Sequence, residues 1–286
     1  MVETRDLKTR SGLAFTAEVA GPIDGPLVLL LHGFPESRHS WREAMPALAA
    51  RGYRAVAPDQ RGYSPGARPD PAQLASYKFE HLVADAVEIA AAAGRPEGRF
   101  HLVGHDWGGQ VAWGVAHFHP ARLASLTILS RPHPASFRRA LLKPDGEQKH
   151  RSRHHRKFLE PETADLLLAD DARRLRRNLA SQFVPDEAIA RHVGVLGSKP
   201  ALEAALAWYR ANVGLVAEIG VIQVPTLYIW GDADGTVGPD AAHGTGEFVA
   251  APFTMEVLPG VGHFVMDQAA GRATALLLDH MARHPI

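Results

Sequence analysis

Apolar residues are concentrated in short runs along the first half of the chain, and longer segments with helical spacing lie between them. The run Leu27–Leu31 is apolar at every position, which predicts a central parallel strand that is buried on both faces. Similar apolar runs predict four more strands, at 13–20, 54–57, 100–103 and 125–129. Helical spacing predicts three helices, at 40–50, 79–93 and 110–116. We expect the strand at 13–20 to lie at the edge of the sheet. Strands that alternate with helices indicate a mostly parallel, doubly wound α/β sheet.

The pattern changes at Arg131, where the alternation of strands and helices stops. From 131 to 217 the chain has helical spacing interrupted by prolines, is rich in Arg and His, and contains no segment that predicts a strand. Strands are expected again at 225–230 and 253–258, followed by a C-terminal helix at 264–283. We therefore predict a core made of 1–130 and 218–286, with a helical cap at 131–217 inserted after the strand that ends near Ser130.

Composition narrows the partners of the protein. The 286 residues are 46% hydrophobic, and Lys plus Arg equal Asp plus Glu at 31 each, so the net charge favours neither a nucleic acid nor an anionic membrane. There is no cysteine, which excludes disulfides, thiolate metal ligands and a cysteine nucleophile. The first residues form no apolar signal segment, and no apolar run reaches the roughly 18 residues of a membrane span. We expect a cytoplasmic protein, monomeric or homodimeric, that acts on an apolar small molecule and contacts neither nucleic acid nor membrane.

The candidate chemistry begins directly after the apolar run 100–103. Gly104 and Gly108 lie two residues before and two residues after Asp106, between a predicted strand and a predicted helix. This is the spacing of a nucleophile elbow, G-x-S-x-G, with aspartate in the place of serine. The central residue of such an elbow is strained, and side chains at the two flanking positions would collide with the neighbouring strand and helix. An ordinary turn with an aspartate near a helix N-cap is the alternative.

A nucleophile of this kind needs an acid and a histidine later in the chain, in that order. Both are found after predicted strands, in loops that contain glycine. The C-terminal ends of parallel strands lie along one edge of a sheet, so these loops should meet Asp106 there. We predict His263 as the catalytic base and Asp234 as its partner, because Asp234 should lie further out on the rim. Asp232 is then expected to tie down its own loop.

Together these motifs resemble the α/β-hydrolase superfamily, in the branch that uses an aspartate nucleophile and includes epoxide hydrolases and dehalogenases. The resemblance is closest to bacterial epoxide hydrolases, spans nearly the whole chain, and rests on four motifs: His32-Gly33-Phe34-Pro35, Gly104-His105-Asp106-Trp107-Gly108-Gly109, Gly231-Asp232-Ala233-Asp234 and Gly262-His263. It implies an α/β-hydrolase fold, an oxyanion hole made of the backbone N–H groups of Phe34 and Trp107, and a cis Phe34–Pro35 bond. It implies no cofactor and no metal ion.

An aspartate nucleophile restricts the reaction. Its attack on an ester or amide carbonyl would give an anhydride, a poor intermediate, whereas attack on saturated carbon gives an alkyl ester that lasts until water is activated. Asp106 needs no base for this attack, because a reference pKa of about 3.9 leaves the carboxyl ionised at neutral pH. His263, oriented by Asp234, would activate water for the second step. The expected electrophile is therefore an epoxide or a carbon–halogen bond.

The leaving group separates these two electrophiles. An opened epoxide leaves an alkoxide that needs a proton donor, whereas a halide leaves without a proton. Epoxide hydrolases of this branch use tyrosines of the cap as donors, and Trp208-Tyr209-Arg210 resembles the triplet that carries one of them, which makes Tyr209 the candidate donor. Where the family has its second tyrosine, this chain has His154 and His155, which are candidates for a second donor. The alternatives are an aromatic packed between cap and core for Tyr209, and a solvated basic face for the histidines.

The first hypothesis is an epoxide hydrolase that forms a vicinal diol through a covalent ester on Asp106. Because the second tyrosine of the family is missing, a haloalkane or haloacid dehalogenase with the same triad is the alternative. Phe34 argues against a haloalkane dehalogenase, since those enzymes commonly have Asn or another polar residue after His-Gly. A third hypothesis is a non-catalytic protein that binds a hydrophobic ligand under its cap, and the intact set of Asp106, Asp234 and His263 argues against it.

Overall fold

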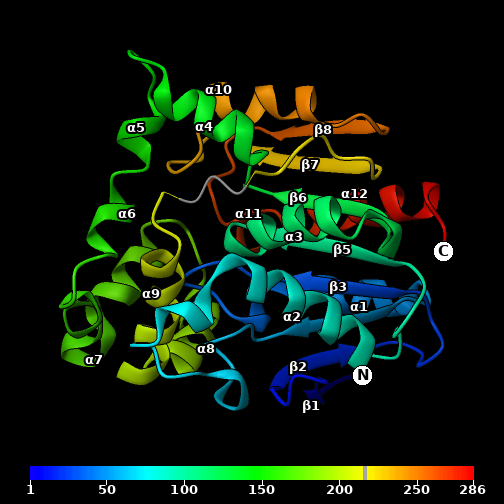
Figure 1. The fold of residues 1–286 in the computed structure, drawn as a ribbon, viewed down its shortest axis with the longest axis horizontal. Helices are drawn as coiled ribbons and strands as arrows, with labels where there is room; N and C mark the ends of the chain where they lie inside the picture. The colour runs from blue at the N-terminus through cyan, green and yellow to red at the C-terminus, as the bar shows by residue number, and fades with distance from the viewer. Residues whose placement is uncertain (215–217) are drawn as a thin grey trace.

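An eight-stranded sheet forms the centre of the computed structural model, which describes residues 1–214 and 218–286 (Figure 1). The strands lie in the order β1-β2-β4-β3-β5-β6-β7-β8; β2 runs antiparallel to both of its neighbours, and the other pairs are parallel. Their bounds are β1 Val2–Lys8, β2 Ala14–Ala20, β3 Leu27–Leu31, β4 Arg54–Pro58, β5 Phe100–His105, β6 Leu123–Leu129, β7 Thr226–Gly231 and β8 Phe253–Leu258. The mostly parallel α/β sheet predicted from the sequence is confirmed.

Helices cover both faces of the sheet and one of its ends. Those on the faces and rim of the sheet are α1 Ala44–Ala50, α2 Phe79–Ala92, α3 Trp107–Phe118, α10 Pro239–His243, α11 Val265–Gln268 and α12 Ala270–Arg283. Those between β6 and β7 are α4 Pro134–Leu142, α5 Gln148–Arg151, α6 His154–Lys157, α7 Thr163–Ala180, α8 Asp186–Leu196 and α9 Lys199–Ala211. Short 3₁₀ segments complete the order at η1 Arg38–Trp41, η2 Pro65–Ala67, η3 Leu74–Tyr77, η4 Pro120–Arg122 and η5 Gly244–Phe248.

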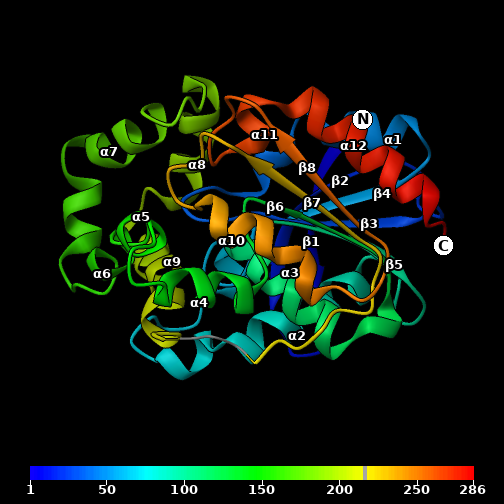
Figure 2. The same cartoon turned by 90° about the horizontal axis from the view of Figure 1, so that it is seen from above.

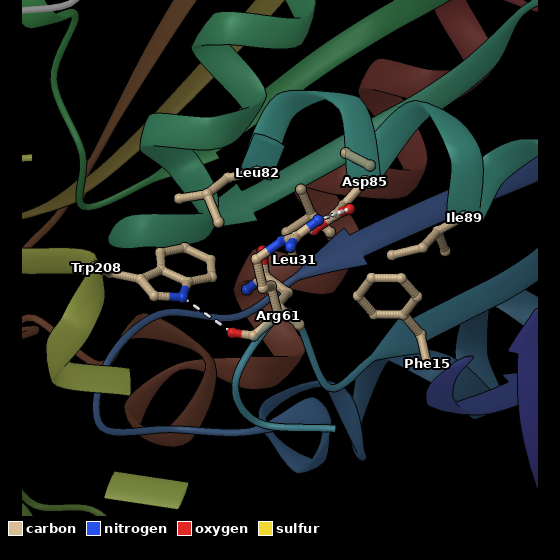
Figure 3. A pocket seen from close by; sticks show the side chains of 9 residues that line it. Phe15, Leu31, Arg61, Leu82, Asp85, Ile89 and Trp208 are labelled. Carbon is tan, nitrogen blue, oxygen red and sulfur yellow. Dashed lines mark hydrogen bonds and ion pairs between the residues drawn. The ribbon is translucent and has the colours of Figure 1, made fainter. Parts of the chain in front are cut away.

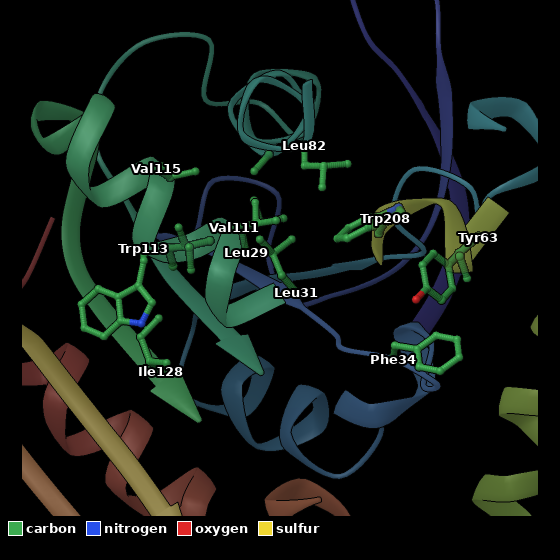
Figure 4. Packing of buried hydrophobic residues seen from close by; sticks show 14 of the residues in the cluster. Leu29, Leu31, Phe34, Tyr63, Leu82, Val111, Trp113, Val115, Ile128 and Trp208 are labelled. Carbon is green, nitrogen blue, oxygen red and sulfur yellow. The ribbon is translucent and has the colours of Figure 1, made fainter. Parts of the chain in front are cut away.

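The apolar run of β3 serves both faces of the sheet, because successive side chains of a strand point to opposite sides. Leu29 and Leu31 belong to the same buried cluster as Val111 of α3, and they lie beside it in the packed core (Figure 4). Val28 and Leu30 belong to a second cluster on the other face. Figure 2 shows α2 and α3 on one side of the sheet and α1 and α12 on the other. The fully apolar pattern of β3 is thus explained by burial on two sides.

The helices between β6 and β7 lie at one end of the sheet. Figure 1 shows α5, α6, α7, α8 and α9 gathered beyond that end, while both termini lie at the opposite end. They are joined to the core by contacts of α8 with η1 and of α9 with η3. Residues 131–214 contain no strand. Of the segment predicted as a cap, 131–217, the last three residues lie outside the described part of the chain.

Three details of the predicted elements were wrong. β2 is not an edge strand, because β1 pairs with it on the outside; the exposed, charged β1 gives no apolar pattern, as suits a sheet edge. The helix predicted at 40–50 is divided into η1 and α1, since Pro46 has no N–H for a helical bond to the carbonyl of Arg42. The C-terminal helix is divided into α11 and α12 at Ala269, where φ is −141°.

Candidate active site

Asp106 lies at the sharp turn between β5 and α3, with φ 47° and ψ −116°, outside the regions that residues with a side chain prefer. The glycines around it are required by close approaches of the backbone. A Cβ on Gly104 would lie 2.3 Å from the carbonyl oxygen of Gly108, and a Cβ on Gly108 would lie 2.2 Å from that of Leu31. Asp106 makes no capping hydrogen bond to α3. The backbone strain and glycine packing expected of a nucleophile elbow are therefore both present.

The carboxylate of Asp106 is buried and held from two sides. The backbone N–H of Phe34 donates to Oδ1 at 3.0 Å, and Oδ2 lies 3.6 Å from Nε2 of His263. Burial would raise the pKa of Asp106, but His263, His105 and the Phe34 N–H outweigh burial and hold the pKa well below its usual range. The carboxylate is thus ionised at neutral pH.

The two predicted oxyanion donors differ in their present contacts. Phe34 already binds Asp106, and its peptide bond to Pro35 is cis, as the family resemblance implied. Trp107 is the first residue of α3, and the described residues include no acceptor for its backbone N–H. An unpaired N–H at a helix start, next to Asp106 in the chain, remains available for an oxygen that becomes negatively charged.

The imidazole of His263 bridges Asp106 and Asp234. Nδ1 donates to Oδ2 of Asp234 at 2.9 Å, and the other oxygen of Asp234 accepts the N–H groups of Thr236 and Val237 at 2.7 and 3.0 Å. Burial would lower the pKa of His263, but Asp234 and Asp106 outweigh burial and raise the pKa to about 10. The structure therefore brings the three residues predicted as a triad into one buried row, in which His263 is hydrogen-bonded to Asp234 and lies 3.6 Å from Asp106.

Asp232 lies apart from this row. It is exposed and accepts the N–H of Gly260 at 2.7 Å, so it ties the loop after β7 to the loop after β8. Asp234 faces His263, as predicted, but the stated reason was wrong. Asp234 is 0% exposed and lies beneath the histidine rather than further out on the rim.

Two cavities meet at Asp106. The α7-side cavity has a volume of about 500 Å³ and is lined by residues of α5, α6 and α7 together with His263. The α4-side cavity has a volume of about 210 Å³ and is lined by residues of α3, α4 and α6. Asp106 and Tyr209 line both cavities. A substrate can therefore extend in two directions from the nucleophile.

Tyr209, on α9, forms part of the wall between the two cavities. Its ring packs edge-on against the rings of Phe34, Trp107 and Phe158, with centroid distances of 5.5, 5.2 and 4.8 Å. Burial, followed by the negative charge of Asp106, raises the pKa of Tyr209 well above its usual value. The phenol is therefore protonated at any pH at which the protein works, which is the state that a hydrogen-bond donor requires.

The neighbouring Trp208 fixes α9 to the core. Its Nε1–H donates to the carbonyl of Arg61 at 2.9 Å, and the Arg61 side chain forms a buried ion pair with Asp85 of α2 at 2.6 Å (Figure 3). The space among these residues is only about 10 Å³, too small for more than a single water molecule. This region therefore positions Tyr209 and binds no substrate.

Comparison with known proteins places this geometry in a family. A family model described as alpha/beta hydrolase fold matches residues 26–270. Epoxide hydrolase A of Mycobacterium tuberculosis is 30% identical over 97% of each chain. The chain belongs to the epoxide hydrolases of the α/β-hydrolase fold family.

Other relatives of this epoxide hydrolase agree. Epoxide hydrolase 3 of Xenopus tropicalis is 31% identical over 95% of this chain and 75% of its own. Among solved structures, an epoxide hydrolase from metagenomes of hot environments has a TM-score of 0.84 at 29% identity, over 98% of each chain. Epoxide Hydrolase A from Mycobacterium thermoresistibile has a TM-score of 0.83 at 27% identity, over 100% of each chain. These relatives do not favour the dehalogenase alternative. Within residues 1–214 and 218–286, no helix is long and apolar enough to cross a membrane.

The two histidines of α6 lie on different sides of this epoxide hydrolase's site. His154 lines the α7-side cavity, and its Nδ1 donates to the carbonyl of Arg151 at 3.0 Å. His155 lines the α4-side cavity, with its ring centroid 5.6 Å from that of Tyr209, and the described residues provide no hydrogen-bond partner for either of its ring nitrogens. Burial lowers the pKa of both, that of His155 to about 3. Both imidazoles are therefore neutral at pH 7.

The sequence reasoning missed a buried ion pair beneath the triad. His105 Nδ1 lies 2.6 Å from Oε2 of Glu36, and His105 Nε2 lies 2.9 Å from the carbonyl oxygen of His263. Burial opposes both charges, but the pair outweighs burial: it raises the pKa of His105 and lowers that of Glu36 to about 2. The protonated His105 can donate from both nitrogens and so holds the backbone of His263. Its position directly before the nucleophile was the one available signal.

Proposed function

We propose that the protein converts an epoxide to a vicinal diol, with Asp106 as the nucleophile. In the first step Oδ2 of Asp106 bonds to an epoxide carbon, the carbon–oxygen bond of the ring breaks, and its electron pair remains on the oxygen. The observation that carries the proposal is the ionised Asp106 carboxylate at the junction of two cavities, fixed between Phe34 and His263. A carboxylate placed in this way needs only a proton donor opposite it to open an epoxide.

The second step hydrolyses the ester on Asp106. Alkylation removes the negative charge of Asp106, so the pKa of His263 falls and Nε2 gives up its proton to solvent. The neutral imidazole can then take a proton from water through Nε2. The resulting hydroxide adds to the carboxyl carbon of Asp106, and the oxyanion that forms is held by the N–H groups of Phe34 and Trp107. Collapse of this intermediate releases the diol oxygen, which receives the proton back from His263. The regenerated carboxyl of Asp106 ionises, and the proton that it loses restores the donor used in the first step. As the charge of Asp106 returns, His263 again takes up a proton. Asp234 holds the imidazole in the required orientation throughout.

Tyr209 is the proposed proton donor to the opened epoxide oxygen, since it shares both cavities with Asp106 and stays protonated. His155 is the better placed of the two candidate partners. A neutral imidazole has one N–H. In neutral His154 that N–H is used by the carbonyl of Arg151, so the other nitrogen can only accept. His155 keeps its N–H for a substrate.

We also propose the domain organisation expected from the sequence, with residues 131–217 as a cap over a core of 1–130 and 218–286. The helices of this segment supply one wall of each cavity and the core supplies the other, which supports this division. A cytoplasmic location is proposed because a chain of this length without cysteine makes no use of an oxidising compartment. A monomer or homodimer without cofactor remains the expected form.

Intact-mass measurement tests the mechanism. Wild type, Asp106→Asn and His263→Gln are each mixed with a panel of epoxides and of haloalkanes and haloacids. We expect diol formation from epoxides by wild type, none by Asp106→Asn, and a covalent adduct of the mass of the epoxide on His263→Gln. Halide release without epoxide turnover would identify a dehalogenase instead. Tight ligand binding that survives Asp106→Ala, with no turnover of any substrate, would identify a non-catalytic binding protein.

A further inference from the structure

Positive side chains outnumber negative ones in the linings of the two cavities. Among the described residues, Asp106 is the only carboxylate in either lining. Each lining has three basic side chains that are permanently charged, namely Arg131, Arg138 and Arg156 on the α4 side and Arg151, Arg153 and Lys157 on the α7 side. The net charge of the whole protein is zero, so this excess of cations is local. It creates a positive potential along the approach to the nucleophile.

Arg131 is the innermost of these cations and is fixed in place. Its Nε–H and one Nη2–H both donate to Oε1 of Gln110, at 3.0 and 2.8 Å, and its guanidinium carbon lies 4.8 Å from the ring centroid of Phe137. The Nε1–H of Trp113 donates to its carbonyl at 3.0 Å. The backbone and the guanidinium of Arg131 are thus both held in place, so the guanidinium is a preformed binding group.

Arg131 nevertheless has no carboxylate partner. It forms no ion pair within the described residues, and the carboxylate whose charge acts on it is Asp106, which loses that charge on alkylation. The three residues outside the description, Leu215 to Ala217, carry no carboxylate in the sequence. A guanidinium has five N–H donors, and the donors on Nη1 reach no acceptor among the described residues. A partly buried cation satisfied only by a neutral amide costs free energy unless an anion pairs with it. This cost indicates a position that is completed by a ligand.

Arg131 and Asp106 line the same cavity, so one substrate can contact both. Gln110, which holds the guanidinium, lies one helical turn from Asp106 on α3, and its N–H donates to the carbonyl of Asp106 at 2.9 Å. The wall beyond Arg131 is apolar, with Pro134, Phe137 and Leu141. A substrate whose epoxide contacts Asp106 can therefore place an anionic end at Arg131 with a hydrocarbon segment between the two.

We propose that Arg131 binds a carboxylate of the substrate, so that the preferred substrates are epoxides that carry a carboxylate on a hydrocarbon chain. This inference rests on the proposed function and modifies the expectation of a purely apolar substrate. Two parallel N–H donors of an arginine fit the two oxygens of a carboxylate. The other cations of the linings attract such a substrate toward both openings.

The test compares terminal epoxides on straight-chain carboxylic acids with the primary amides of the same acids. The amides have nearly the same shape and no charge. We expect wild type to show a kcat/KM about 10- to 100-fold higher for the acids, as is typical when a hydrogen bond involves a charged group. Arg131→Met should lower kcat/KM for the acids about 10- to 100-fold more than for the amides, and Arg131→Lys should keep part of the preference.

The matched control is Arg174→Met, which removes an exposed arginine on α7 that lines neither cavity. It should keep the full preference for acids. Equal kcat/KM of wild type for acids and amides would overturn the proposal, and so would an equal loss for both substrates in Arg131→Met. If no epoxide is hydrolysed at all, the proposed function fails. Binding of the saturated carboxylic acid, measured by isothermal titration calorimetry, then decides the role of Arg131 separately. Tighter binding to wild type than to Arg131→Met supports it, and equal binding overturns it.

Discussion

Nδ1 of His263 donates to Oδ2 of Asp234 at 2.9 Å, and this bond fixes which nitrogen of the histidine can act on water. Because Asp234 is an acceptor only, the proton must stay on Nδ1, and Nε2 faces Asp106 at 3.6 Å. The second oxygen of Asp234 is held by two backbone N–H groups, so the carboxylate cannot rotate away. One orientation of His263 is therefore selected before any substrate binds, and Nε2 is the nitrogen that loses its proton when the imidazole becomes neutral.

Replacement of Asp234 by Asn should separate the two steps of the reaction. The side-chain amide keeps the shape but loses the charge and can present a donor to His263, which favours the wrong tautomer. We expect hydrolysis of the ester on Asp106 to slow by about 10²- to 10⁴-fold, while its formation changes less. Quenched-flow sampling with intact-mass detection measures both rates.

Asp232→Asn is the matched control, because Asp232 is exposed and binds only Gly260 of the neighbouring loop. It should form and hydrolyse the ester at rates close to those of wild type. Ester accumulation in Asp232→Asn but not in Asp234→Asn would reverse the assignment of the two aspartates.

The raised pKa of His263 predicts a specific pH dependence of stability. Its pKa is about 10 in the folded protein, against an ordinary value of 6.5, so the folded state binds the proton more tightly than the unfolded chain does. This contribution is fully present below about pH 6.5 and is lost as the pH rises through about 10. The difference in unfolding free energy between wild type and His263→Gln, measured in urea, should therefore shrink across this range. A difference that is constant from pH 6.5 to 10 would contradict the raised pKa.

The two histidines of α6 should differ in their effect on ring opening. His155 has a free N–H directed to the cavity that it shares with Tyr209, whereas the N–H of His154 is bound to the backbone. We expect His155→Phe to slow ester formation by at least about tenfold, and His154→Phe to change it much less. Single-turnover kinetics with a slow epoxide measure this step. The opposite order of effects would show that His154 turns toward the substrate when the site is occupied.

The strained turn at Asp106 and the row of Asp106, His263 and Asp234 could be predicted because their signals are local. The glycine spacing around Asp106 and the position of His263 in the loop after a strand are both visible within a few residues of sequence. The fold followed from the same alternation of strands and helices. β1 was not predicted, because an exposed edge strand needs no apolar pattern and its charged residues contact water instead.

The sequence gives weaker information on contacts between segments that are far apart. The ion pair of Glu36 with His105 joins residues 69 positions apart, and no pattern in either segment predicts this contact. The difference between His154 and His155 depends on how α6 packs against α9. The exposure of Arg131 to a cavity likewise depends on α4 and α3 together. Such features are set by packing and become visible only in three dimensions.

The hydrogen bond from Trp208 to Arg61 should contribute measurably to stability. Trp208→Phe keeps an aromatic ring but leaves the carbonyl of Arg61 without its donor, which should cost about 1–3 kcal/mol of unfolding free energy. Trp41→Phe is the matched control, since Trp41 is also fully buried but its Nε1 has no partner within the described residues. Urea denaturation should show a larger loss for Trp208→Phe. Equal losses in the two variants would mean that ring packing, and not this bond, fixes α9.

A methyl group at Gly108 should be far more damaging than its size suggests. The added Cβ would lie 2.2 Å from the carbonyl oxygen of Leu31. The backbones of Gly108 and Leu31 are both buried, so β3 and α3 would have to separate. We expect Gly108→Ala to lose about 3 kcal/mol or more of unfolding free energy, or to fail to fold. Gly194→Ala, on the exposed side of α8, meets nothing within 4 Å and should instead stabilise the protein by up to about 1 kcal/mol, because alanine favours a helix over glycine. Thermal and urea denaturation of the two variants provide the comparison. A Gly108→Ala protein as stable as wild type would show that the elbow can relax, and the close approach of α3 to β3 would then not be what holds Asp106 in its strained conformation.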